Sequence, residues 1–241
     1  MFAGARVATV AISYSYVKKM LVRLAVPFAL AAVAGGCNGG GVETDETAAP
    51  ERAATAAATT PTGTLAGGRL VSALRGGGFV IYIRHAATDP VPDDSDPVVF
   101  SDCSTQRNLS GAGRGQAREI GQAIDALDIP IGRVLSSPFC RALDTAGLAF
   151  GTVTREPVIE NLETAETEAE SDARVRGLRR LLAAPPDEAT NDVLVAHGFN
   201  ITAAAEITIG EGEAAIFRPN GEAGFVLIAM ISPDEWSELA E

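Results

Sequence analysis

The chain has 241 residues, of which 46% are hydrophobic and 21% charged, and its formal net charge is −12 at pH 7. Residues 1–37 contain four of the 19 basic residues and no acidic one, so the remainder sets 15 arginines against 31 acidic residues. This excess of negative charge repels nucleic acid and anionic lipid headgroups, so nucleic-acid binding is excluded as a function. Arginines gathered around a small anion would be local exceptions on this surface.

The N-terminus has the pattern of a targeting segment. Basic residues precede an apolar stretch over residues 24–34, and small residues lead from there to Cys37. This order predicts a secretory signal over residues 1–37. Eleven apolar residues are too few to cross a bilayer, which takes about 20. Met20 is an alternative start to Met1, because the signal does not need the apolar residues before it.

Residues 34–37, Ala-Gly-Gly-Cys, resemble the bacterial lipobox, although Ala34 replaces the usual leucine. This resemblance implies an N-terminal lipid anchor at Cys37, and cleavage without lipidation is the alternative. We therefore expect an extracytoplasmic bacterial protein, either periplasmic or a membrane-anchored lipoprotein.

The rest of the chain divides in two. Residues 38–66 are mainly Gly, Ala, Thr, Glu and Pro, so they cannot bury enough apolar surface to offset their ordering entropy. We expect a flexible low-complexity linker there. Residues 67–241 are long enough for one domain with a full core.

Within that domain, apolar strand-like runs alternate with amphipathic helices. We expect strands over 79–84, 131–136, 156–160 and 192–196, helices over 110–127, 139–150, 174–182 and 200–205, a hairpin of 215–218 and 225–231, and a short terminal helix with Trp236. Ser110 is the expected N-cap of the first helix. The alternation predicts an α/β fold with a mainly parallel central sheet.

The only two histidines, His85 and His197, each follow an expected strand. Ligands bind at the carboxyl ends of the strands in open α/β sheets. Arg84 precedes the first histidine, and an arginine beside an imidazole favours an anion such as phosphate. The two histidines therefore predict one anion site at this edge of the sheet.

Four motifs in order resemble those of the histidine phosphatase superfamily. Residues 82–88, Tyr-Ile-Arg-His-Ala-Ala-Thr, resemble its Arg-His-Gly signature, with Ala86 in place of glycine. Residues 108–110, 136–142 and 195–198 resemble its Leu-Thr helix start, its second arginine motif and its second histidine motif. The resemblance covers about residues 70–231. It implies the phosphoglycerate mutase-like fold, with three α/β/α layers around a mainly parallel sheet.

The resemblance also implies a role for each site residue. His85 is the expected nucleophile, whose unprotonated ring nitrogen attacks phosphorus and forms a phosphohistidine. Arg84, Arg141 and His197 are expected to bind the phosphoryl oxygens. Guanidinium groups suit this task because they offer planar forks of donors and stay charged.

The general acid is less defined. Relatives often take the leaving-group proton from a carboxylate after the third strand, where this chain has Glu163 closest to the family's position and Glu160 as its rival. A solvated acidic face is the alternative. Some relatives, including bacterial phosphohistidine phosphatases, lack this acid, so the site residue is Glu163, Glu160 or neither.

The cysteines and the remaining acidic residues indicate no metal site or other cofactor. If Cys37 carries lipid, Cys103 and Cys140 remain as an even pair, for which we expect a disulfide, with two buried thiols as the alternative. A metal beside the two histidines would be repelled by the flanking arginines.

These observations predict a metal-independent extracytoplasmic phosphatase. It would hydrolyse a phosphomonoester, such as a sugar phosphate, through a phosphohistidine on His85. Two alternatives stay open, namely a protein phosphohistidine phosphatase and a catalytically inactive phosphate-binding module.

Overall fold

The computed structural model describes residues 64–187 and 189–240. The predicted signal over 1–37 and all but the last three residues of the predicted linker lie outside these residues. The strands are β1 (Val80–Arg84), β2 (Ile131–Ser136), β3 (Thr154–Arg155), β4 (Asn191–Ala196), β5 (Ala214–Pro219) and β6 (Phe225–Ile231). The helices are α2 (Gly67–Arg75), α3 (Gly111–Ala126), α4 (Cys140–Phe150), α5 (Glu168–Ala183), α6 (Gly198–Ala205) and α7 (Pro233–Ala240).

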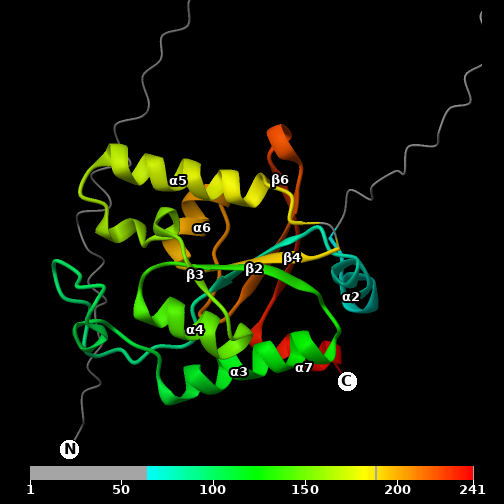
Figure 1. The fold of residues 1–241 in the computed structure, drawn as a ribbon, viewed down its shortest axis with the longest axis horizontal. Coiled ribbons are helices and arrows are strands. Elements are labelled where there is room, and N and C mark those ends of the chain that lie inside the picture. Colours follow the sequence, from blue (N-terminus) through cyan, green and yellow to red (C-terminus); the bar gives the residue numbers. More distant parts are fainter. Residues whose placement is uncertain (1–63, 188, 241) are drawn as a thin grey trace, which may run out of the picture. The chain divides into compact units, whose positions relative to one another are not determined.

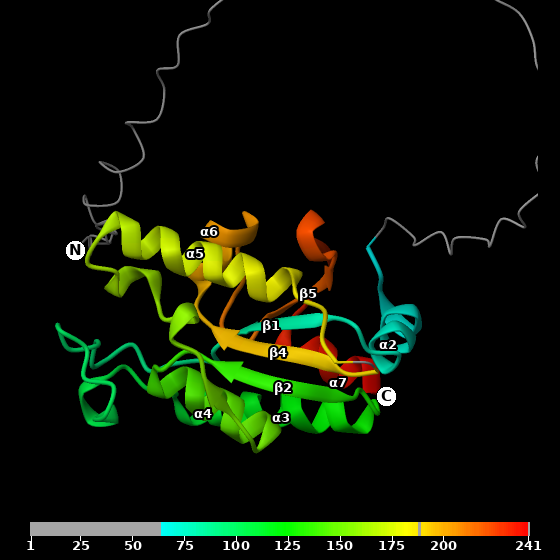
Figure 2. The ribbon, with the colours of Figure 1, turned by 45° about the horizontal axis from the view of Figure 1, so that its top comes forward.

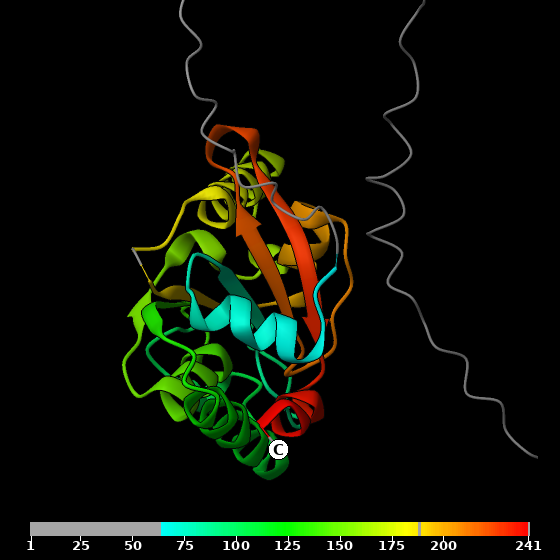
Figure 3. The ribbon, with the colours of Figure 1, turned by 90° about the vertical axis from the view of Figure 1, so that its right-hand side faces the viewer.

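The six strands form one sheet in the order β3-β2-β4-β1-β5-β6. The first four in this order run parallel, whereas β5 and β6 are antiparallel and form the expected hairpin. Helices α5 and α6 lie on one side of the sheet, and α3, α4 and α7 lie on the other (Figures 1 and 2). Helices α2 and α7 contact each other, so the first and last described helices lie close together (Figure 3). The predicted three-layer α/β/α fold is confirmed.

The apolar run of β1 is explained by burial on both faces of the sheet. Ile81 and Ile83 belong to the core that includes residues of α2, α3, α4 and α7. Val80 and Tyr82 belong to the second core, with residues of α5 and α6. Successive side chains of a strand point to opposite faces, so a strand covered on both sides has no polar alternation.

Most expected elements are confirmed, and Ser110 does cap α3 by accepting the Gly113 N–H. The strand expected over 156–160 is wrong, because Pro157 begins the 3-10 turn η2 (Pro157–Ile159). Proline has no N–H to give to a sheet. The strand pairing with β2 lies earlier, at Thr154–Arg155.

Two helices differ from expectation as well. Helix α5 begins at Glu168 rather than at residue 174, because Thr167 caps it by accepting the Glu170 N–H. Helix α2 was not expected, and it buries Leu70, Val71 and Leu74. No helix in the described part of the chain is both long and apolar enough to cross a membrane.

Candidate active site

The two histidines lie together at the carboxyl edge of the parallel strands. Strands β1 and β4 are neighbours, and Arg84 pairs in register with Ala196, so His85 and His197 follow at the same level. Their ring centroids are 5.4 Å apart with an interplanar angle of 63°. Both residues are buried, with 2% and 3% exposure. The structure therefore brings the two rings within reach of one small ligand.

The hydrogen bonding of His85 fixes which of its ring nitrogens is free. Its Nδ1 lies 3.0 Å from the Ala86 carbonyl oxygen, which only accepts, so Nδ1 carries the proton and Nε2 keeps its lone pair. Burial lowers the pKa of His85 to about 3, although the bond to Ala86 opposes the shift. Three arginines lower this pKa further: Arg84, Arg107 and Arg141. His85 is therefore neutral at pH 7, as a nucleophile must be.

His197 is held differently. Its Nε2 lies 2.8 Å from the Ser137 Oγ, at the carboxyl end of β2. The Tyr82 hydroxyl donates to the His197 carbonyl at 2.7 Å and accepts the His197 N–H at 3.1 Å, which fixes the backbone. Burial, with the charges of nearby arginines, holds the pKa of His197 well below its usual value. The ring is neutral in the free protein, and a bound dianion would favour its protonated form.

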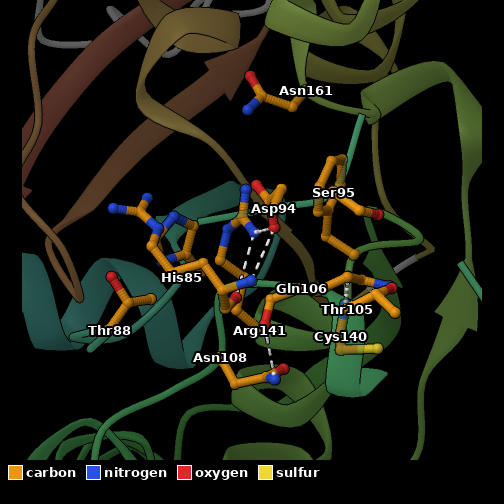
Figure 4. A network of polar contacts seen from close by, with 12 residues as sticks. His85, Thr88, Asp94, Ser95, Thr105, Gln106, Asn108, Cys140, Arg141 and Asn161 are labelled. Carbon is orange, nitrogen blue, oxygen red and sulfur yellow. Dashed lines mark hydrogen bonds and ion pairs between the residues drawn. The ribbon is translucent and has the colours of Figure 1, made fainter. Parts of the chain in front are cut away.

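Two guanidinium groups border the histidines, that of Arg141 buried and that of Arg84 partly exposed. Arg141, in the first turn of α4, donates to Asp94 at 2.9 Å and to the Arg107 carbonyl at 3.3 Å, close to His85 (Figure 4). Arg84 donates to the Ile209 carbonyl at 3.1 Å. The Nε atoms of both arginines are buried without a protein partner among the described residues. Buried donors are normally satisfied, so this arrangement fits an oxyanion.

Two charged residues at the site were not singled out from the sequence. The Arg107 carbonyl accepts from Arg141 at 3.3 Å, and the charge of Arg107 contributes, after burial and the other arginines, to the lowered pKa of both histidines. Its one sequence signal is its place directly before the motif over residues 108–110. Glu211 lies 3.6 Å from the Arg84 guanidinium and 4.0 Å from the His85 Nδ1. Nothing distinguished it among the many acidic residues of the chain.

The two candidate acids have different surroundings. Burial lowers the pKa of Arg141, while the charges of Asp94 and Glu163 act in the opposite direction, so the Glu163 carboxylate lies within electrostatic reach of the site. Glu160 instead forms an ion pair with Arg174 at 2.7 Å and accepts the Thr164 hydroxyl at 2.7 Å. Of the two, only Glu163 is among the charges that influence the pKa of Arg141.

The substitution at Ala86 is compatible with the site. Ala86 is fully buried, and its N–H donates to the Thr145 Oγ1 at 3.0 Å. It is not among the non-glycine residues with positive φ. The backbone conformation therefore does not require glycine here.

A disulfide borders the site, as expected for Cys103 and Cys140. The bond joins the 3-10 turn η1 (Cys103–Thr105) to the first residue of α4, with the two Cα atoms 5.7 Å apart. The Cys140 N–H also donates to the Gln106 Oε1 at 2.9 Å. Because Arg141 follows Cys140 directly, the disulfide links the turn η1 to the residue next to this guanidinium. Among the described residues, no three His, Cys, Asp or Glu side chains are grouped so that they could hold a metal ion.

No family model and no curated protein matches the sequence. The fold is similar to solved structures that are named as phosphatases. A putative phosphohistidine phosphatase SixA from Agrobacterium tumefaciens is 20% identical, with a TM-score of 0.44, over 65% of this chain and 99% of that one. A putative alpha-ribazole-5'-P phosphatase from Escherichia coli is 16% identical, with a TM-score of 0.48, over 65% and 98%. A mycobacterial glucosyl-3-phosphoglycerate phosphatase is 18% identical, with a TM-score of 0.45, over 63% and 97%.

Proposed function

We propose that the protein is a phosphatase of the histidine phosphatase superfamily that hydrolyses a phosphomonoester through a phosphohistidine on His85. One observation carries the proposal: two buried, neutral histidines and the buried side chain of Arg141 meet at one edge of the sheet, beside Arg84. The free Nε2 of His85 supplies the nucleophile. The arginines supply fixed donors for a tetrahedral anion.

In the first step, the His85 Nε2 attacks phosphorus and forms the P–N bond. The ester P–O bond breaks, its electron pair stays on the leaving oxygen, and Glu163 in its acid form protonates that oxygen. Arg84 and Arg141 stabilise the charge spread over the three other oxygens. His197, protonated in the presence of the dianion, donates a further hydrogen bond.

In the second step, the Glu163 carboxylate takes a proton from a water molecule that attacks the phosphoryl group. The P–N bond breaks, its electron pair returns to the His85 Nε2, and inorganic phosphate leaves. The acid of the first step is thus the base of the second, and the site returns to its starting protonation. We propose that neither step needs a metal ion.

The substrate that fits best is a small phosphorylated molecule such as a sugar phosphate. The acidic body disfavours polyanions. An extracytoplasmic location, periplasmic or anchored through lipid on Cys37, is supported by the disulfide, since such bonds persist in oxidising compartments.

A protein phosphohistidine phosphatase is a second candidate. Glu163 is exposed and contacts Asn161 rather than either phosphate-binding arginine. A phosphorylated imidazole is a better leaving group than a sugar hydroxyl, so it needs less help from an acid.

The test of the proposal is to trap the intermediate. Purified protein is mixed with p-nitrophenyl phosphate in the presence of a chelator, quenched within milliseconds, and analysed for base-stable phosphohistidine. We expect labelling of His85, and His85→Ala should lose both the label and the turnover. Full turnover in that variant would contradict the mechanism, and vanadate binding without any turnover in the wild type would favour a non-catalytic module.

The acid is tested by the leaving group. Glu163→Gln should slow hydrolysis of a sugar phosphate by about 100-fold and that of p-nitrophenyl phosphate much less, because nitrophenolate leaves without a proton. Glu160→Gln is the matched control, and it should lower stability through Arg174 without this dependence on the leaving group. Equal rates for Glu163→Gln and wild type with both substrates would show that Glu163 is not the general acid. That result would favour the protein phosphohistidine phosphatase.

A further inference from the structure

The backbone places Glu211 beside the nucleophile. The Gly212 N–H lies 3.1 Å from the Arg84 carbonyl oxygen and 3.0 Å from that of His85, so this turn is joined to the end of β1. Gly212 has φ +77°, and a Cβ there would lie 2.4 Å from the Gln116 Oε1. Only glycine avoids both the strained conformation and the collision, so the turn holds Glu211 at a defined position.

The Glu211 carboxylate is itself fixed by one neighbour. Its Oε1 accepts the Thr88 hydroxyl at 2.8 Å, and its Oε2 accepts the Thr88 N–H at 3.2 Å. Both oxygens therefore act as acceptors, which suits the ionised form. The same Oε1 lies 3.6 Å from the Arg84 guanidinium and 4.0 Å from the His85 Nδ1.

Phosphorylation changes the charge of the His85 ring. The ring begins neutral with its proton on Nδ1, and the Ala86 carbonyl cannot take that proton. Attack by Nε2 therefore leaves a positive charge on the ring, in a buried place that three arginines already make unfavourable for cations. Of the described carboxylates, only that of Glu211 lies within 4.0 Å of a ring nitrogen of either histidine.

We propose that Glu211 is a positioning residue that stabilises the cationic ring of phosphorylated His85 and orients Arg84. The inference rests on the proposed function. A carboxylate beside the far nitrogen of a catalytic histidine does the same in serine hydrolases, where it stabilises the imidazolium that forms. Glu211 differs in acting across 4.0 Å, because the Ala86 carbonyl holds the Nδ1 proton.

The experiment compares Glu211→Gln with Glu213→Gln. Both variants lose one negative charge from the same turn and keep an acceptor, but the Glu213 side chain accepts the exposed Gly210 N–H and does not contact the histidines. Rapid quenching should show phosphohistidine formation slowed at least about tenfold in Glu211→Gln and within about twofold of wild type in Glu213→Gln. The kcat should fall by a larger factor than KM changes, because the ring becomes cationic only after attack, and the smaller change in KM reports the orientation of Arg84.

Equal rates of phosphohistidine formation in Glu211→Gln and wild type would overturn the inference. If Glu211→Gln does not fold, Thr88→Val tests the same point, because it removes the hydroxyl that holds the carboxylate. It should slow phosphorylation severalfold, and a wild-type rate would overturn the inference. A wild-type protein that never forms phosphohistidine would refute the proposed function itself.

Discussion

The ends of β1 and β4 carry the two histidines in nearly the same setting, yet each ring has a different kind of partner. Both follow a parallel strand, both are buried, and burial depresses the pKa of both. The His85 Nδ1 meets a carbonyl, which only accepts, whereas the His197 Nε2 meets the Ser137 hydroxyl, which can donate or accept. Burial makes both rings neutral, and the hydrogen-bond partner decides which one can serve as nucleophile.

The largest effect should separate the two histidines. His85→Gln should abolish phosphohistidine formation, because no other ring presents a free nitrogen in this position. His197→Gln should keep a label on His85 but form it about 100- to 1,000-fold more slowly, since it removes a donor to the transition state. Rapid quenching followed by identification of the labelled residue measures both, and a label on His197 would reverse the assignment.

A smaller effect should be the same for both histidines. Each folded pKa lies below the unfolded value near 6.5, so each histidine contributes stability fully above that pH and loses it as pH falls toward the folded pKa. Lowering the pH from about 7 to about 5 should therefore reduce the free energy of unfolding by about 1–2 kcal/mol for each histidine. Because these are the only histidines, urea titrations of the double His→Gln variant should show most of this slope removed. An unchanged slope would contradict the burial of neutral rings.

The smallest effect should come from Ser137→Ala. This substitution removes the hydrogen-bond partner of the His197 ring and leaves that of the His85 ring in place. The free energy of unfolding should fall by about 1 kcal/mol. Turnover should fall severalfold, while the labelled residue remains His85. Steady-state kinetics with p-nitrophenyl phosphate and thermal unfolding measure the two parts. Full activity would show that the Ser137 contact does not orient the ring.

The sequence predicts the parts of the site that depend on strand register. Apolar runs covered on both faces identify β1 and β4, and parallel neighbours necessarily end at the same edge, so the meeting of His85 and His197 could be expected. The arginine at the start of α4 was predicted in another way, from the resemblance of residues 136–142 to the second arginine motif of the family. The prediction for the two histidines needs only element types and their order.

Other features depend on contacts that a linear pattern does not contain. The position of the Glu160 carboxylate depends on its ion pair with Arg174, which lies 14 positions later in the sequence. Glu211 reaches the site through backbone bonds between Gly212 and the end of β1, more than 120 residues earlier in the chain. In a chain with 31 acidic residues, such a carboxylate has no local signature. The short β3 was misplaced because the apolar residues after Pro157 look like a strand.

The bond between Cys103 and Cys140 has a practical consequence for anyone who assays the protein. It closes a chain segment with a sequence separation of 37 and ends one residue before Arg141. Thiols in a purification buffer would break this covalent link and leave only non-covalent contacts, such as hydrogen bonds, between the segment and the helix that carries this guanidinium. Screening for substrates should therefore be run on oxidised protein with its thiol content titrated beforehand.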